Sequence, residues 1–139
     1  MFLRIVVIGF TAFVAWIIHV ANTGGSNIIL DTVHTIPAGD KLGHFFVMGT
    51  FAYLVNLLLA CKTFTLGRFR ILNGSVIVLV CVVLEEITHM FIRTRTFSYL
   101  DLLSDFLGIV AFSILAVKTY PYIANLLNRA SQRGLDTSM

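Results

Sequence analysis

The chain of 139 residues has the length of a single domain; 58% of its residues are hydrophobic and only 12% are charged. Charged residues make up about a quarter of an ordinary soluble domain, and a disordered chain is poor in aromatic and aliphatic residues, so both classes are excluded. The net charge is +3, but no segment carries a basic stripe, which also excludes a nucleic-acid-binding protein.

Four apolar stretches follow one another along the chain, at residues 2–21, 42–61, 71–90 and 100–120. Each is close to the roughly 20 residues that cross a bilayer as a helix. In the first, His19 stands where a signal-peptide cleavage site needs a small residue, so we expect a retained helix. Pro121 lacks the N–H that a helix needs and is expected to end the last stretch, leaving a polar cytoplasmic tail, residues 121–139. Strands are not expected, because the stretches are long and lack alternation. The sequence therefore predicts an all-α, integral membrane bundle of four transmembrane helices, with residues 1–139 as one membrane domain.

The basic residues divide unequally between the two sides of such a bundle. Seven of the ten lie on the side of the two termini and the connection at residues 62–70, namely Arg4, Lys62, Arg68, Arg70, Lys118, Arg129 and Arg133. Cytoplasmic segments collect Lys and Arg, so both termini are predicted to be cytoplasmic. The opposite, outer side or its membrane boundary holds most acids and all histidines, namely Asp31, Asp40, Glu85, Glu86, Asp101, Asp105, His19, His34, His44 and His89.

Three spaced groups of polar residues stand at the outer ends of the stretches. They are Asp40-Lys41-x-x-His44, Glu85-Glu86-x-x-His89 followed by Arg93 and Arg95, and Asp101-x-x-x-Asp105. Residues three or four apart share a helix face. A charge in mid-bilayer costs about 2.5–3.5 kcal/mol on insertion scales, so such residues are either functional or paired across helices. The pairs Glu86 with Arg95 and Asp105 with Lys41 would satisfy the second interpretation.

These residues resemble the pattern of the VanZ-like family of small multi-pass bacterial membrane proteins. The matching positions are Asp40, Lys41, His44, Glu86, Arg95, Ser98, Asp101 and Gly108, within residues 36–116. His89 stands where the family usually has Gln, and Asp105 where it usually has Asn. The resemblance selects Glu86 rather than Glu85, and it implies a bacterial cytoplasmic (inner) membrane location. The founding member is associated with reduced susceptibility to teicoplanin, a glycopeptide that acts on the outer cell envelope.

The first hypothesis is a polar site on the outer side that acts on or binds an envelope lipid, a glycan precursor or an amphiphilic antibiotic. Its candidate catalytic residues are His44, Glu86, Arg95 and Asp101, and its candidate ligand-binding residues are Asp40, Lys41, His89, Arg93, Ser98 and Asp105. The guanidinium groups of Arg93 and Arg95 match a phosphate or carboxylate, and His44 and Glu86 are suited to proton transfer. The expected partners are membrane lipids, a lipid-linked precursor or glycopeptide, or another membrane protein. No cofactor is expected, and the residues leave open whether the protein is an enzyme.

Two alternatives remain beside this hypothesis. The protein could be a non-catalytic accessory subunit that packs against an envelope enzyme or transporter. It could also be a membrane metalloenzyme that uses His44, Glu86, His89 and Asp105, since Glu-x-x-His occurs in carboxylate–histidine metal bundles. Ser98 is expected to cap the last helix rather than to act as a nucleophile, because it lacks a Gly-x-Ser-x-Gly turn.

Overall fold

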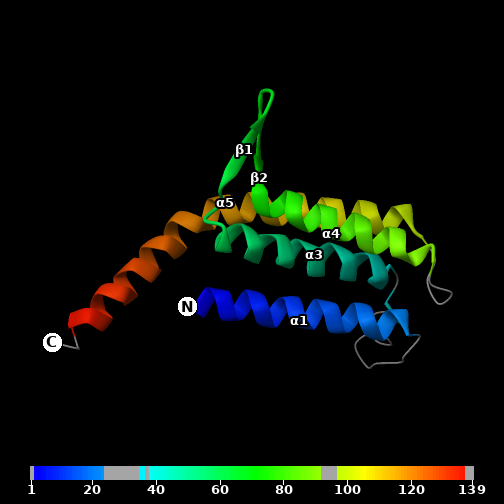
Figure 1. Ribbon diagram of the computed structural model, residues 1–139, viewed down its shortest axis with the longest axis horizontal. Helices are drawn as coiled ribbons and strands as arrows, with labels where there is room; N and C mark the ends of the chain where they lie inside the picture. Colours follow the sequence, from blue (N-terminus) through cyan, green and yellow to red (C-terminus); the bar gives the residue numbers. More distant parts are fainter. Residues whose placement is uncertain (1, 24–34, 37, 92–96, 137–139) are drawn as a thin grey trace.

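The computed structural model describes residues 2–23, 35–36, 38–91 and 97–136 and is built mainly from helices (Figure 1). Its elements are α1 (Phe2–Asn22), α3 (Gly39–Leu58), β1 (Thr63–Leu66), β2 (Phe69–Leu72), α4 (Asn73–His89) and α5 (Tyr99–Asp136). Successive helices run side by side in opposite directions (Figure 1). One end of the bundle therefore holds the N-terminus of the chain and the two strands. The other end holds the start of α3, the end of α4 and the start of α5.

Three helical segments among the described residues are long and apolar enough to cross a membrane. They are Phe2–Asn22, Gly39–Leu58 and Tyr99–Leu126. Helix α4 has 17 residues, just short of that length. The predictions of a membrane protein and of transmembrane helices are thus confirmed for three of the four predicted spans. The observed helix ends differ from the predicted ones by at most three residues, except at the end of the last helix.

The prediction that Pro121 ends the last helix is wrong, because α5 continues through it to Asp136. A proline removes one backbone hydrogen bond, to the carbonyl four residues earlier, and its ring crowds that carbonyl, so a helix can bend there without ending. Figure 1 shows such a change of direction in the orange part of α5, the part that contains Pro121. Residues 121–136 of the predicted tail are therefore a continuation of the last helix.

The connection at residues 62–70 contains strand structure, which the all-α prediction did not include. Strands β1 and β2 form an antiparallel hairpin in which Thr63 pairs with Leu72 and Leu66 pairs with Phe69. Gly67 has a φ of 61° at the first position of the two-residue turn, the conformation that a type II′ turn requires and that glycine adopts without strain. The fold is thus a helical bundle with one projecting hairpin.

Helix α3 lies at the centre of the bundle and makes its closest contact with α5. The buried core is formed by Val14, Met48, Ala52, Val55, Val78, Val82 and Ile109. A Cβ atom on Gly108 would collide with the backbone carbonyl of Phe45, and one on Gly49 would lie 2.6 Å from the ring of Phe112. These two glycines allow α3 and α5 to pack backbone against backbone, as small residues do in membrane helices.

A hydrogen-bonded group of three polar side chains joins α3, α4 and α5 inside the bundle. The amide of Asn56, which is fully buried, donates to Ser75 Oγ at 2.9 Å and to Ser113 Oγ at 3.2 Å. The two serine hydroxyls are 2.7 Å apart. Such interhelical bonds contribute about 0.6 kcal/mol each in membrane proteins, so this group helps to hold the relative rotation of the helices.

Candidate functional site

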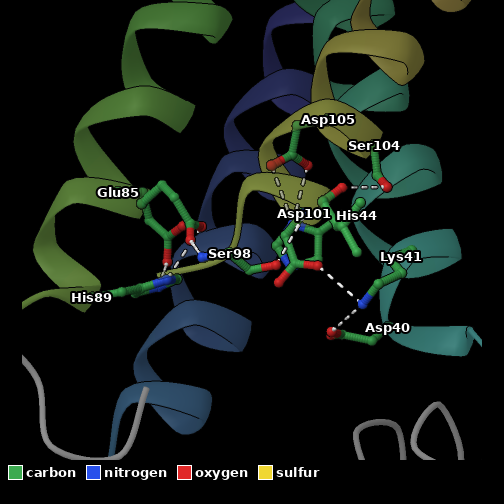
Figure 2. Close-up of polar contacts among 11 residues, drawn as sticks. Asp40, Lys41, His44, Glu85, His89, Ser98, Asp101, Ser104 and Asp105 are labelled. Carbon is green, nitrogen blue, oxygen red and sulfur yellow. Dashed lines mark hydrogen bonds and ion pairs between the residues drawn. The ribbon is translucent and has the colours of Figure 1, made fainter. Parts of the chain in front are cut away.

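The predicted polar residues that the structure describes gather at one end of the bundle, where α3 and α5 begin and α4 ends (Figures 1 and 2). This juxtaposition follows from the alternating helix directions. Residues early in α3 and α5 reach the same level as residues late in α4. The three groups, whose members lie up to 65 residues apart in sequence, therefore form one polar site.

His44 on α3 contacts Asp105 on α5, across the interface between the two most closely packed helices. His44 Nδ1 lies 3.1 Å from Oδ1 and 3.2 Å from Oδ2 of Asp105. Asp105 is only 1% exposed. The predicted pair of Asp105 with Lys41 is therefore wrong, since His44 occupies the position of that partner.

Lys41 instead contacts a different carboxylate of α5. Its Nζ lies 3.3 Å from Asp101 Oδ1 and 3.7 Å from Asp40 Oδ2. Its side chain is more than a third exposed, so it marks the open side of the site. His44 and Asp105 thus form one contact between α3 and α5, and Asp40, Lys41 and Asp101 form a separate set of ion pairs between the same two helices (Figure 2).

Ser98 joins this set to the end of α4. Its hydroxyl accepts a hydrogen bond of 3.3 Å from the backbone N–H of Asp101, which confirms the predicted helix cap. Its own backbone N–H donates to Glu86 Oε1 at 2.6 Å. The start of α5 is therefore tied to the last turn of α4 through one residue.

The last turn of α4 holds a group formed by the half-buried Glu85 and the buried Glu86 and His89. His89 Nε2 lies 2.6 Å from Glu85 Oε1, and His89 Nδ1 lies 3.2 Å from Glu86 Oε2. Glu86 and His89 are 1% and 3% exposed. The second of these contacts has the distance of an ion pair but not the alignment of a hydrogen bond, so Glu86 Oε2 and His89 Nδ1 have no hydrogen-bond partner among the described residues.

Sequence reasoning undervalued Glu85. The family pattern selects Glu86, and the structure does bury that side chain more deeply, yet Glu85 also contacts the site through His89. The signal was present in the spacing, because Glu85 and His89 are four residues apart and share a helix face. Arg93, Arg95, Asp31 and His34 lie outside the described residues, so the predictions made for them, including the Glu86–Arg95 pair, are untested.

A shallow apolar groove of about 340 Å³ lies between α4 and α5 beside the polar site. Val83 precedes Glu86 by three residues on α4, and Leu102 directly follows Asp101 on α5. On α4 the groove thus lies one turn deeper than Glu86, whereas on α5 its lining overlaps the level of Asp101 and Asp105. Its lining consists of Leu79, Val83, Tyr99, Leu102, Leu103 and Phe106.

Comparison with known protein families, curated proteins and solved structures finds no match for this chain.

Proposed function

We propose that this chain is a VanZ-like protein of the bacterial cytoplasmic membrane, with four spans and both termini in the cytoplasm, whose outward polar site binds an amphiphilic molecule of the cell envelope. One observation carries the proposal: acid–base groups from three helices converge at one end of the bundle, beside an apolar groove. The fourth span is α4, which is close to the needed length and packs against both α3 and α5.

An amphiphile fits this arrangement because the two kinds of surface adjoin. The groove offers apolar side chains at the level of the bilayer, where an acyl or isoprenoid chain would lie. The polar residues adjoin the groove, on the same stretch of α5 and in the next turn of α4, where the headgroup of such a molecule would lie. A lipid-linked glycan precursor has both parts.

The charge of the site favours a head that carries hydroxyl or amino groups. Among the described residues the site contains five carboxylates, against one lysine and two histidines. These carboxylates are Asp40, Glu85, Glu86, Asp101 and Asp105. Carboxylates accept hydrogen bonds from hydroxyl and amino groups but repel a phosphate. The phosphate of a lipid-linked precursor would therefore depend on Arg93 and Arg95, whose guanidinium groups are suited to it.

Proton transfer is the chemistry that the site is best equipped for. The contact with Asp105 favours a proton on Nδ1 of His44, and this leaves Nε2 to accept a proton from a bound hydroxyl. Glu86, Asp101 and Arg95 would then position the head. His44 is then the general base, and the apolar groove holds the chain of the substrate and so determines how deep the substrate lies in the bilayer.

Envelope profiling of a deletion strain complemented with variants tests this function. We expect His44→Ala to reproduce the changes in lipids and glycan precursors seen in the deletion strain, at an unchanged protein level. His19→Ala is the matched control. It removes an exposed histidine in the last turn of α1, at the same end of the bundle as His44. A normal profile for His44→Ala would contradict the proposal. Full activity of Glu86→Gln together with co-purification of one membrane protein would favour the accessory-subunit alternative.

Filling the groove tests the apolar half of the proposal separately. Val83→Trp places a bulky ring in the groove, whereas Val80→Trp adds the same ring at an exposed position outside it. We expect the first variant to lose the envelope phenotype and the second to keep it. Equal activity of the two variants would show that the groove holds no part of the ligand.

Cysteine labelling tests the orientation. In a background without Cys61 and Cys81, we expect a membrane-impermeant maleimide to label Phe91→Cys in intact cells, because Phe91 is 83% exposed just beyond the end of α4 and does not line the groove. Gly67→Cys at the tip of the hairpin should react only after the cells are lysed. The reverse pattern would place the polar site in the cytoplasm.

A metal centre is a second candidate function, favoured by the group at the end of α4. Glu85, Glu86 and His89 each offer a ligand atom, and these atoms lie within 4.8 Å of one another. The set differs from the predicted His44, Glu86, His89 and Asp105, because His44 and Asp105 contact each other and Glu85 joins the group instead. Two buried atoms, Glu86 Oε2 and His89 Nδ1, have no hydrogen-bond partner among the described residues. Both atoms are therefore free to coordinate a divalent cation. Calorimetric titration of untagged protein with Zn²⁺ or Mn²⁺ should show binding that Glu85→Gln weakens; absence of binding would exclude this candidate.

A further inference from the structure

The hairpin at the end of the bundle opposite the polar site has two chemically different faces. Cross-strand partners lie on the same face of a sheet, and residues two apart along a strand share that face. The pairs Phe64 with Ile71 and Leu66 with Phe69 therefore form one apolar face. The pair Thr65 with Arg70 belongs to the opposite face, where Arg70 also donates a hydrogen bond of 3.5 Å to Thr63 Oγ1.

The apolar face is not covered by the part of the chain that the structure describes. Leu66 and Phe69 are 63% and 62% exposed, and Phe64 is 41% exposed. An isolated two-stranded hairpin is at best marginally stable in water. The apolar face of this hairpin therefore needs a surface to lie on.

The direction of the hairpin matches a membrane surface. It projects crosswise to the axes of the helices at the end of the bundle (Figure 1). Because the helices cross the bilayer, a crosswise element at their ends runs along the bilayer surface.

The joint between α3 and β1 holds this direction. Ala60 and Cys61 adopt left-handed backbone conformations, with φ angles of 54° and 50°. Hydrogen bonds from Cys61 N to Asn56 O (2.7 Å) and from Asn73 N to Lys62 O (2.9 Å) tie the base of the hairpin to α3 and α4. The exit angle is thus set by backbone geometry rather than by contacts along the strands.

The charge of the hairpin is complementary to anionic lipid. Lys62, Arg68 and Arg70 are all exposed, and no acidic residue occurs between Asp40 and Glu85 in the sequence. The guanidinium carbon of Arg68 lies 5.4 Å from the centre of the Phe69 ring, so an apolar and a cationic group are presented together at the turn. This combination of aromatic and basic side chains is typical of elements that lie in the headgroup region.

We propose that the β1–β2 hairpin is a binding element for anionic phospholipids in the leaflet at its end of the bundle. The face formed by Phe64, Leu66, Phe69 and Ile71 lies at the boundary between headgroups and acyl chains. Lys62, Arg68 and Arg70 bind the phosphate groups. The hairpin would then hold the vertical position of the bundle in the bilayer, a role independent of the ligand at the opposite end.

Fluorescence quenching of the full-length protein in vesicles tests this proposal. In a Trp16→Phe background, Phe69→Trp places the reporter on the apolar face and Thr65→Trp places it on the polar face. With brominated phosphatidylcholine we expect blue-shifted, strongly quenched emission for Phe69→Trp and solvent-like emission for Thr65→Trp. Equal quenching of the two reporters, or solvent-like emission from both, would overturn the proposal; in the second case the apolar face is left for a protein partner.

The lipid charge is tested with the same reporter. We expect brominated phosphatidylglycerol to quench Phe69→Trp more strongly than brominated phosphatidylcholine. Removing Arg68 and Arg70 with glutamine substitutions should lower this preference about fivefold per residue, since each cation near an anionic surface contributes about 1 kcal/mol. Arg129→Gln, on the C-terminal part of α5 rather than on the hairpin, is the matched control. An unchanged preference after the two hairpin substitutions would show that the arginines do not bind the anionic headgroups.

Discussion

His44 Nδ1 lies between the two carboxylate oxygens of Asp105, at 3.1 Å from one and 3.2 Å from the other, where α3 and α5 pack most closely. The VanZ-like pattern that the sequence resembles usually has Asn at the position of Asp105, and an amide oxygen could accept the same hydrogen bond. The side chain at position 105 can therefore act in two ways, as a hydrogen-bond acceptor for His44 and as a negative charge beside it.

Substitution of Asp105 distinguishes these roles. We expect Asp105→Asn to keep nearly the stability of the wild type, because it retains an oxygen acceptor for His44. Asp105→Ala should lower the free energy of unfolding by about 1–3 kcal/mol, since it leaves a half-buried imidazole without its partner. Unfolding in mixed micelles measures both values, with the more exposed Asp40→Ala as control. An equal loss for the Asn and Ala variants would show that the charge is the essential feature.

The close approach of α3 and α5 depends on Gly108. A Cβ at this position meets the backbone carbonyl of Phe45, so Gly108→Ala should lower the free energy of unfolding by about 1–3 kcal/mol. Gly9→Ala makes the same chemical change in α1, where no atom of the described residues lies within 4 Å of the new Cβ, and should be neutral or stabilising because alanine favours a helix. The same unfolding assay checks both variants. An unchanged free energy of unfolding for Gly108→Ala would mean that α3 and α5 can move apart by enough to fit a methyl group without losing stability.

The cap at the start of α5 depends on the hydroxyl of Ser98. Ser98→Ala removes the acceptor of the Asp101 N–H and should cost about 1 kcal/mol, with faster amide exchange in the first turn of α5. Ser98→Asn should restore protection, because its side-chain oxygen can accept the same bond. Ser104→Ala is the control, since Ser104 bonds back only to Leu100 O of its own helix. Unchanged exchange in Ser98→Ala would contradict the capping role.

Cys61, at the base of the hairpin, should react slowly with alkylating reagents. Partial burial raises the pKa of its thiol above the ordinary value of 9.0. The nucleophile is the thiolate, so a raised pKa lowers the reactive fraction at neutral pH and shifts the rise in rate to higher pH. The pH profile of iodoacetamide labelling in a Cys81→Ala variant measures this. A midpoint at or below that of the unfolded protein would contradict it.

Features that depend on a few neighbouring residues were predictable from the sequence. Long apolar stretches indicate membrane helices because hydropathy over about 20 residues is a local property. The same is true of the Ser98 cap and of the helix-face spacings within each polar group. The gathering of these groups at one end followed from the alternation of helix directions. The residues alone therefore predicted the membrane class and the gathering of the described polar groups.

The tertiary structure decided which partners meet. Asp105 contacts His44 rather than Lys41, and Glu85 joins His89, because the rotation and relative shift of the helices determine which side chains face each other. The continuation of α5 through Pro121 and the hairpin at Thr63–Leu72 also escaped prediction. One lost hydrogen bond is small against the helical bonds on either side, and alternation over four residues is too short a signal to identify a strand. The sequence determined the chemistry at each end of the bundle, whereas packing decided which groups pair, because pairing depends on the mutual orientation of helices that are far apart along the chain.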